Sequence, residues 1–189
     1  MCEEEKKPKK ILELGAGKHW KKYSKKTKVL ATCVDSSYER GPSYMYDNIT
    51  LIGRDIFKFL EKCNESFDDI IANRVFEHID YDKLPYLFYL CKEVLNTNGE
   101  LTFTVPDFSK ILEKINEIDP NGPAAQFNRD MIDTHTELFN TPKDPHRSIW
   151  TKTLVRYYVE LEDFWKFQDV AHVTLDNRDW YMRVILKKK

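Results

Sequence analysis

Short apolar runs alternate with segments of helical periodicity along the first two thirds of the chain. The runs begin with Ile11–Leu14 and Val29–Val34, and similar ones follow near positions 51, 67 and 101. Apolar side chains then recur every three or four positions, which predicts amphipathic helices over Tyr81–Leu95 and around Ile111–Ile118. This alternation predicts an α/β fold, in which a doubly wound, Rossmann-like and mostly parallel sheet is covered by helices on both faces.

The pattern changes in the last third of the chain. Residues 154–186 alternate apolar and polar positions, which predicts an antiparallel C-terminal hairpin at the sheet edge. Residues 120–150 are polar and aromatic and follow the fifth predicted strand, at the carboxyl end of the sheet, where open α/β folds bind ligands. We therefore expect this insert to be the substrate-binding region. The helix between the second and third strands is expected to be short or missing, because only about fifteen residues separate Asp35 from Leu51.

Composition narrows the class of protein. The chain has 189 residues, of which 41% are hydrophobic and 32% are charged, and its net charge is −1. These values fit a single domain over residues 1–189 with no overall preference for polyanions. The charged first residues and the lack of a long apolar run indicate a cytoplasmic protein without a signal peptide or membrane span. The four cysteines form no CxxC pair and are expected to be reduced thiols.

The segment Ile11–Gly17 carries the most specific chemistry. A buried strand is followed by two glycines, and the next residues can begin a helix, so a nucleoside-like cofactor can lie against bare backbone. Glu13 precedes the turn, where a carboxylate would repel a pyrophosphate but suits a cofactor with an ammonium or sulfonium charge. Trp20 stands where the dinucleotide fingerprint has its third glycine. Both features favour S-adenosylmethionine over NAD.

Further motifs follow the glycine turn in order. They are Val29–Asp35, Leu51–Ile56, Phe67–Ile79 and Asn96–Asp107, each of which combines an apolar run with polar residues at its end. Together they make the chain resemble the class I S-adenosylmethionine-dependent methyltransferases, in particular the small type 11 group, over roughly residues 9 to 118. The resemblance implies a seven-stranded sheet that finishes with the antiparallel hairpin.

The resemblance also implies a binding site for S-adenosylmethionine. Asp35 would hold the ribose hydroxyls, and Asp55 would meet the adenine amino group. Local alternatives stay open, with Glu13 as a cap of backbone amides and Asp55 as the N-cap of a helix over Ile56–Cys63. The residues expected to bind the cofactor are Glu13, Gly15, Ala16, Gly17, Asp35, Ser36, Asp55, Ile56, Asn73, Arg74 and Val75.

Methylation of an alcohol needs a group that takes the hydroxyl proton as the methyl group arrives. The candidates are His146 and His135 in the polar insert and Asp107 at the tip of the fifth strand. The two histidines lie near several acids, so a weak metal site is an alternative, but no metal is expected. The resemblance also bears on His78. In the family that the chain resembles, a histidine at this position more often packs under the cofactor or caps the next helix than transfers a proton.

The acceptor is predicted to be a hydroxyl of a small polar molecule such as a sugar or glycan. This hypothesis rests on the polar insert and on the similarity to small methyltransferases encoded near glycan-building genes. The lysines between Lys6 and Lys28 could neutralise phosphates, which makes an RNA or other nucleic-acid substrate the alternative, but such a cluster is more often a solvated surface. However, Asn73–Phe76 replaces the Pro-Pro-aromatic motif of DNA amine methyltransferases. A non-catalytic partner subunit with the same fold is the third possibility.

Overall fold

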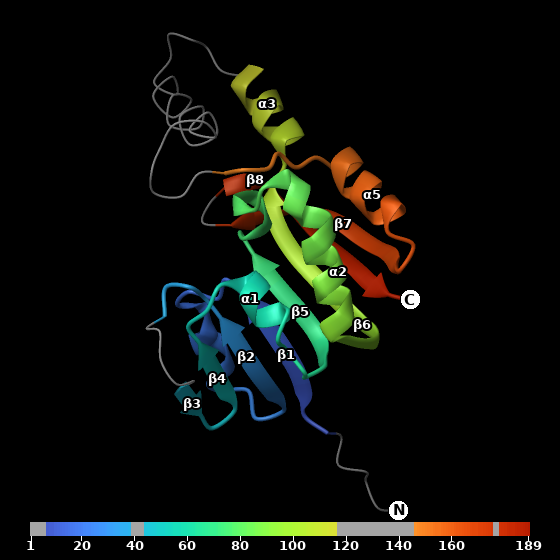
Figure 1. The fold of residues 1–189 in the computed structure, drawn as a ribbon. Helices are drawn as coiled ribbons and strands as arrows, with labels where there is room; N and C mark the ends of the chain where they lie inside the picture. The colour runs from blue at the N-terminus through green and yellow to red at the C-terminus, as the bar shows by residue number, and fades with distance from the viewer. Residues whose placement is uncertain (1–6, 39–43, 117–145, 176–177) are drawn as a thin grey trace, which may run out of the picture.

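The computed structural model describes residues 7–38, 44–116, 146–175 and 178–189, which form one eight-stranded sheet with helices packed on it (Figure 1). The strands are β1 (Lys9–Leu14), β2 (Val29–Val34), β3 (Tyr44–Tyr46), β4 (Ile49–Ile52), β5 (Phe67–Asn73), β6 (Leu95–Pro106), β7 (Trp165–Leu175) and β8 (Arg178–Lys188). The helices are η1 (His19–Tyr23), α1 (Ile56–Leu60), η2 (Phe76–His78), η3 (Tyr81–Lys83), α2 (Leu84–Val94), α3 (Phe108–Asn116) and α5 (Lys152–Leu161), where η marks a 3-10 helix.

The strand order is β3-β4-β2-β1-β5-β6-β8-β7. Strand β1 pairs in parallel with both β2 and β5, β2 pairs in parallel with β4, and β5 with β6. Strand β8 runs antiparallel to β6 and β7. The strands that follow β1 in the chain are therefore added first on one side of it (β2, β4 and β3) and then on its other side (β5, β6, β8 and β7). This reversal creates a topological switch point between β1 and β5. The doubly wound sheet and its antiparallel C-terminal hairpin are confirmed.

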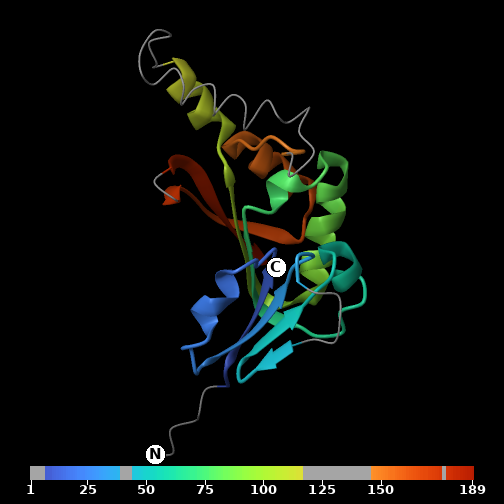
Figure 2. The same ribbon diagram turned by 90° about the vertical axis from the view of Figure 1, so that its left-hand side faces the viewer.

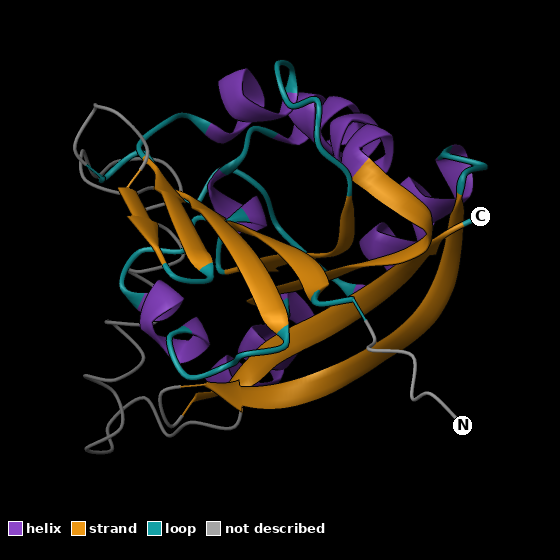
Figure 3. Ribbon diagram, turned by 90° about the horizontal axis from the view of Figure 1, so that it is seen from below, coloured by secondary structure: helices purple, strands orange, loops and turns teal. Residues whose placement is uncertain are grey.

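The sheet is covered on its two faces by layers of different thickness (Figure 2). The main core lies between one face of the sheet and helices α1, α2 and α5, and it includes Leu12, Phe76, Phe88 and Phe103. On the opposite face, η1 covers β1, β2 and β4 through the buried ring of Tyr23. The thicker helical layer, formed by α1, α2 and α5, and the curved β7–β8 ribbon are also visible from below (Figure 3).

Helix α2 confirms the predicted amphipathic periodicity. Its buried residues recur at helical spacing and face the sheet: Leu84, Leu87, Phe88, Leu90, Cys91 and Val94. The helix begins three residues later than the predicted Tyr81, because Pro85 occupies its first turn and the preceding residues form η3. Cys91 is fully buried, as expected of a small apolar residue, and Cys33, Cys63 and Cys91 are all free thiols.

The C-terminal region differs from the prediction at its start. The alternating segment was expected to begin at residue 154, but Lys152–Leu161 is helix α5 and the hairpin begins only at Trp165. The Thr151 side chain caps this helix by accepting a hydrogen bond from the Leu154 amide at 3.2 Å. Val155 and Val159 are four residues apart and are both buried, so their spacing fits a helix better than a strand.

Two predictions concern the connections around the sheet. Between β2 and β4, the described residues form turns and the short strand β3, which pairs antiparallel with β4 at the sheet edge. Strand β3 is additional to the seven strands expected and takes the place where a helix was predicted to be short or missing. The polar insert over residues 120–150 lies outside the described residues except for its last part, residues 146–150.

Candidate cofactor and catalytic site

Two glycines shape the turn after β1. Both have left-handed backbone conformations, with φ of 61° at Gly15 and 46° at Gly17. A β-carbon added to Gly15 would lie 2.4 Å from Cγ2 of Val75, so a larger residue does not fit there. The Gly17 amide donates a hydrogen bond to Oδ2 of Asp35 at 2.7 Å. Because this bond ties the ends of β1 and β2 together, the turn is held in an open shape with bare backbone on its surface.

Asp35 organises the tip of β2. Its Oδ1 accepts hydrogen bonds from the amide of Ser37 at 2.8 Å and from the hydroxyl of Ser37 at 2.6 Å. The Tyr38 hydroxyl donates a hydrogen bond to the Gly17 carbonyl oxygen at 2.7 Å. It is the second hydrogen bond between the turn after β1 and the turn after β2. A carboxylate has about four acceptor positions, so Asp35 retains capacity for a further donor.

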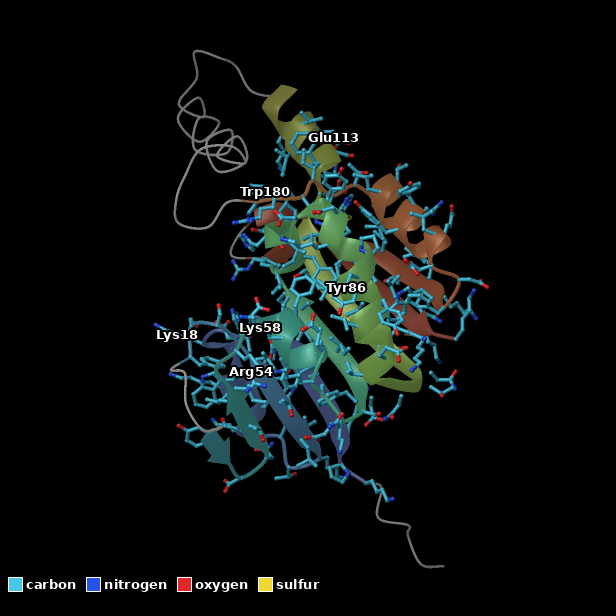
Figure 4. All side chains as sticks on the ribbon, in the orientation of Figure 1. Lys18, Arg54, Lys58, Tyr86, Glu113 and Trp180 are labelled. Carbon is cyan, nitrogen blue, oxygen red and sulfur yellow. The ribbon has the colours of Figure 1, made fainter. Side chains whose placement is uncertain are left out.

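These turns line a cleft of about 380 Å³ at the carboxyl ends of β1, β2, β4 and β5. The lining consists of Gly15, Asp35, Ser36, Asp55, Ile56, Arg74, Val75, His78 and Ile79. The structure therefore brings together seven of the predicted cofactor residues, at the switch point where this topology places ligands. Lys18 and Lys58, which follow the glycine turn and Asp55 in the chain, are labelled near this edge in Figure 4.

A larger hollow of about 510 Å³ lies at the opposite, amino ends of the strands. Its lining includes Lys10, Asn48 and Phe67, and it contains neither the glycine turn nor any of the predicted cofactor residues. Since ligands of open α/β sheets bind at the carboxyl ends, the smaller cleft is the candidate site.

Asp55 combines the two roles that the sequence left open. Its side chain accepts a hydrogen bond from the Lys58 amide at 3.1 Å and so caps α1, while the residue also lines the cleft. The predicted helix over Ile56–Cys63 is shorter than expected and ends at Leu60. Ile56, the first residue of α1, lines the cleft beside its cap.

The end of β5 turns sharply toward the cleft. Arg74 has a φ of 56°, which is unusual for a residue other than glycine, and its amide donates to the Thr104 carbonyl oxygen at 2.9 Å. Asn73 lies outside the cleft lining, and its Oδ1 accepts a hydrogen bond from the Thr104 hydroxyl at 3.1 Å. The turn thereby aims Val75 at the glycine backbone, where its methyl group closes the space beside Gly15.

Glu13 is buried and has a charged partner within the protein. Only 1% of the residue is exposed, and its Oε1 accepts a hydrogen bond from Nζ of Lys22 at 2.7 Å. Neither Glu13 nor Ala16 and Gly17 lines the cleft. Burial, and to a smaller extent the Glu13 carboxylate, raise the pKa of the Cys33 thiol to about 12. Glu13 therefore links β1 to η1 through Lys22, and a direct contact with a cofactor stays a prediction.

Asp107 forms a pair that the sequence did not predict. Its carboxylate is buried at the tip of β6, and Oδ2 lies 2.8 Å from Nε2 of His172 on β7. The Ser109 amide donates to the other carboxylate oxygen at 3.1 Å. His172 keeps about a third of its side chain exposed. The sequence placed His172 in a strand, but no local signal connected it to an acid that lies on another strand.

His146 lies beside the cleft because residues 146–150 dock on η2. The amides of Arg147 and Ser148 donate to the carbonyl oxygen of Glu77 at 2.6 and 3.1 Å. The hydroxyl of Ser148 also donates to the Phe76 carbonyl oxygen at 2.9 Å. These bonds bring the ring of His146 to 4.9 Å, between centroids, from the ring of His78, which lines the cleft.

The remaining predictions around this segment have separate outcomes. Trp150 and Trp165 are buried in the core, whereas Tyr157 is exposed. His135 lies outside the described residues. Among the described helices, none is long and apolar enough to cross a membrane.

Comparisons with known proteins place this geometry in a fold family. No protein-family model and no curated protein sequence matches the chain. Solved structures do match. The plantazolicin methyltransferase BpumL, in complex with a monoazolic desmethylPZN analog and SAH, is 14% identical with a TM-score of 0.64, over 96% of this chain and 76% of that one.

Two further structures agree. The N-methyltransferase NodS from Bradyrhizobium japonicum WM9 is 12% identical with a TM-score of 0.60, over 96% of this chain and 86% of that one. The pyocyanin biosynthetic protein PhzM is 14% identical with a TM-score of 0.59, over 98% of this chain and 52% of that one, so the chain spans about half the length of PhzM.

The protein has the class I methyltransferase fold. The resemblance inferred from the sequence motifs is thereby confirmed at the level of the fold. The helical layer that covers β1, β2 and β4 is thin in this protein. Its helix η1 has only five residues, and the connection from β2 to β4 contains the short strand β3, which pairs with β4. Trp20, which replaces the third glycine, stacks on Tyr46 of β3 with the ring centroids 5.4 Å apart. The bulky residue thus fills space outside the cleft rather than inside it.

Proposed function

We propose that the protein is an S-adenosylmethionine-dependent methyltransferase. The observation that carries this proposal is the cleft at the β1/β5 switch point, where a bare glycine turn, an acid at the tip of β2 and the N-terminus of α1 come together. Its volume of about 380 Å³ is within the usual range for small-molecule sites. Structures with the same fold, including BpumL, contain SAH.

The chain's own residues suit such a cofactor. At Gly17 a β-carbon would meet only the Asp35 carboxylate at 3.9 Å, so the backbone there is accessible. Asp35 is held by Ser37 and Gly17 in an orientation that leaves acceptor capacity for ribose hydroxyls. Ile56 and Val75 offer apolar contacts for the adenine ring. When bound, S-adenosylmethionine supplies an electrophilic methyl group on a sulfonium.

For the acceptor, we propose a hydroxyl of a small polar molecule, with a sugar or glycan as the leading class. The acceptor oxygen forms the new bond to the methyl carbon as the carbon–sulfur bond breaks, and the hydroxyl proton passes to a base. His146 is our first candidate for the base, because its ring lies against the cleft-lining His78. Asp107 is the second candidate, since the pair with His172 provides a route for a proton.

Calorimetry with S-adenosylhomocysteine tests the proposal directly. We expect roughly micromolar binding, and Asp35→Asn should weaken it about 10- to 150-fold, because a hydrogen bond to a charged group contributes about 1.5–3 kcal/mol. Asp163→Asn is the matched control, because this carboxylate is fully exposed and pairs only with Lys189 among the described residues. Absence of S-adenosylhomocysteine binding by the wild-type protein, together with binding of NADH, would refute the proposed function.

A further inference from the structure

Three side chains with metal-ligating atoms converge beside the cofactor cleft. They are Glu77 and His78, from η2, and His146, from the segment that docks on it. One ligand atom from each lies within 4.8 Å of the other two. We propose that these residues bind one divalent transition-metal ion of the zinc class, at a site separate from the residues assigned above to the cofactor.

The backbone around the three residues holds them in place. Helix η2 follows the turn at Arg74, and its first residue, Phe76, is completely buried in the main core. The Glu77 carbonyl oxygen receives the amides of Arg147 and Ser148, so the residue after His146 is tied to the residue before His78. Glu77 is 1% exposed, and the two histidines are half-buried. The site is therefore sheltered on the carboxylate side and accessible on the imidazole side.

The ligand chemistry selects the class of metal. Two imidazole nitrogens and one carboxylate oxygen form a donor set that catalytic zinc sites use, with the remaining positions open to water or substrate. In a tetrahedral site with ligand–metal distances of about 2.0–2.2 Å, the donor atoms lie roughly 3.3–3.6 Å apart. The three donor atoms here lie within 4.8 Å of one another, so binding one ion requires the side chains to close by up to about an ångström, for which the half-buried imidazole rings leave room.

The location suggests what the ion does. His78 lines the cofactor cleft, and His146 lines a neighbouring small hollow with Pro106 and Phe108. An open coordination position at this border would bind the acceptor oxygen and lower its pKa, so that the hydroxyl loses its proton to water or to a nearby base. This role rests on the proposed methyl transfer, whereas metal binding itself does not. With the ion bound, His146 is a ligand and the hydroxyl proton passes to water; without the ion, the free imidazole is the base proposed above.

Metal titration of the full chain tests the proposal. Protein stripped with a chelator should bind one Zn²⁺ per chain by calorimetry, and Co²⁺ should produce a visible absorption band. His78→Ala and His146→Ala should each weaken Zn²⁺ binding at least tenfold and abolish the Co²⁺ band, since even partners outside the ligand shell contribute about 10- to 100-fold. His19→Ala is the matched control, because this histidine is exposed on η1.

The outcomes separate this proposal from the proposed function. Circular dichroism of each variant establishes that it is folded, and neither substitution removes a fully buried side chain because both histidines are half-buried. The absence of stoichiometric Zn²⁺ binding, or equal affinity in the wild type and both histidine variants, would overturn the metal site. S-adenosylhomocysteine binding is measured in parallel without metal. Its loss alone would count against the methyltransferase and not against the metal site.

Discussion

Substitution of Gly15 by alanine is the sharpest test of how the glycine turn is built. The added β-carbon would lie 2.4 Å from Cγ2 of Val75, far inside van der Waals contact, and the residue has a φ of 61°. The left-handed conformation costs a non-glycine residue about 1–2 kcal/mol. Overpacking against the methyl group adds about 1–3 kcal/mol. We therefore expect Gly15→Ala to lower the free energy of unfolding by about 2–5 kcal/mol.

Gly17→Ala provides the matched comparison. Gly17 also has a positive φ, of 46°, but its added β-carbon would meet only Oδ2 of Asp35, at an ordinary contact distance of 3.9 Å. Only the backbone cost of about 1–2 kcal/mol then applies. Urea unfolding followed by circular dichroism should place the two variants in the order wild type, Gly17→Ala, Gly15→Ala, with similar slopes.

A double-mutant cycle isolates the steric part. In a Val75→Ala background the methyl group that blocks the new β-carbon is absent, so Gly15→Ala should cost only the backbone term. The coupling free energy between positions 15 and 75 should therefore be about 1–3 kcal/mol. Equal stability of Gly15→Ala and Gly17→Ala, or a coupling within experimental error of zero, would refute the close approach of Val75, in the turn after β5, to the glycine turn.

Two further predictions concern the reaction and the basic surface. His146→Ala should lower kcat about 10²–10⁴-fold while S-adenosylhomocysteine binding is retained, and full activity of this variant would transfer the role to Asp107. Changing Lys21, Lys25 and Lys26 to Gln should leave activity on a neutral acceptor nearly unchanged, because none of the three lysines lines the cleft. A sub-micromolar complex of the wild type with RNA or DNA, with a steep salt dependence, would instead support a nucleic-acid substrate.

Features that depend on neighbouring residues could be predicted from the sequence. The glycine turn needs left-handed backbone at Gly15 and Gly17, and that requirement is local. Apolar alternation and helical periodicity likewise report burial within one strand or helix, which is why β1, β2 and α2 were anticipated. Parallel strands place their carboxyl ends at one edge, so the grouping of Asp35, Asp55 and Val75 in one cleft followed from the order of the strands.

Features that join distant segments were decided only by the tertiary structure. Sequence reasoning assigned Glu13 to the cofactor, but the packing of η1 gives it Lys22 as a partner. The pairs Asp107–His172 and His78–His146 each join residues from separate elements, whose relative position depends on how the sheet edge and the docking segment pack. No spacing rule encodes such contacts, because a side-chain pair across elements depends on the sum of many packing interactions and not on the local residue pattern.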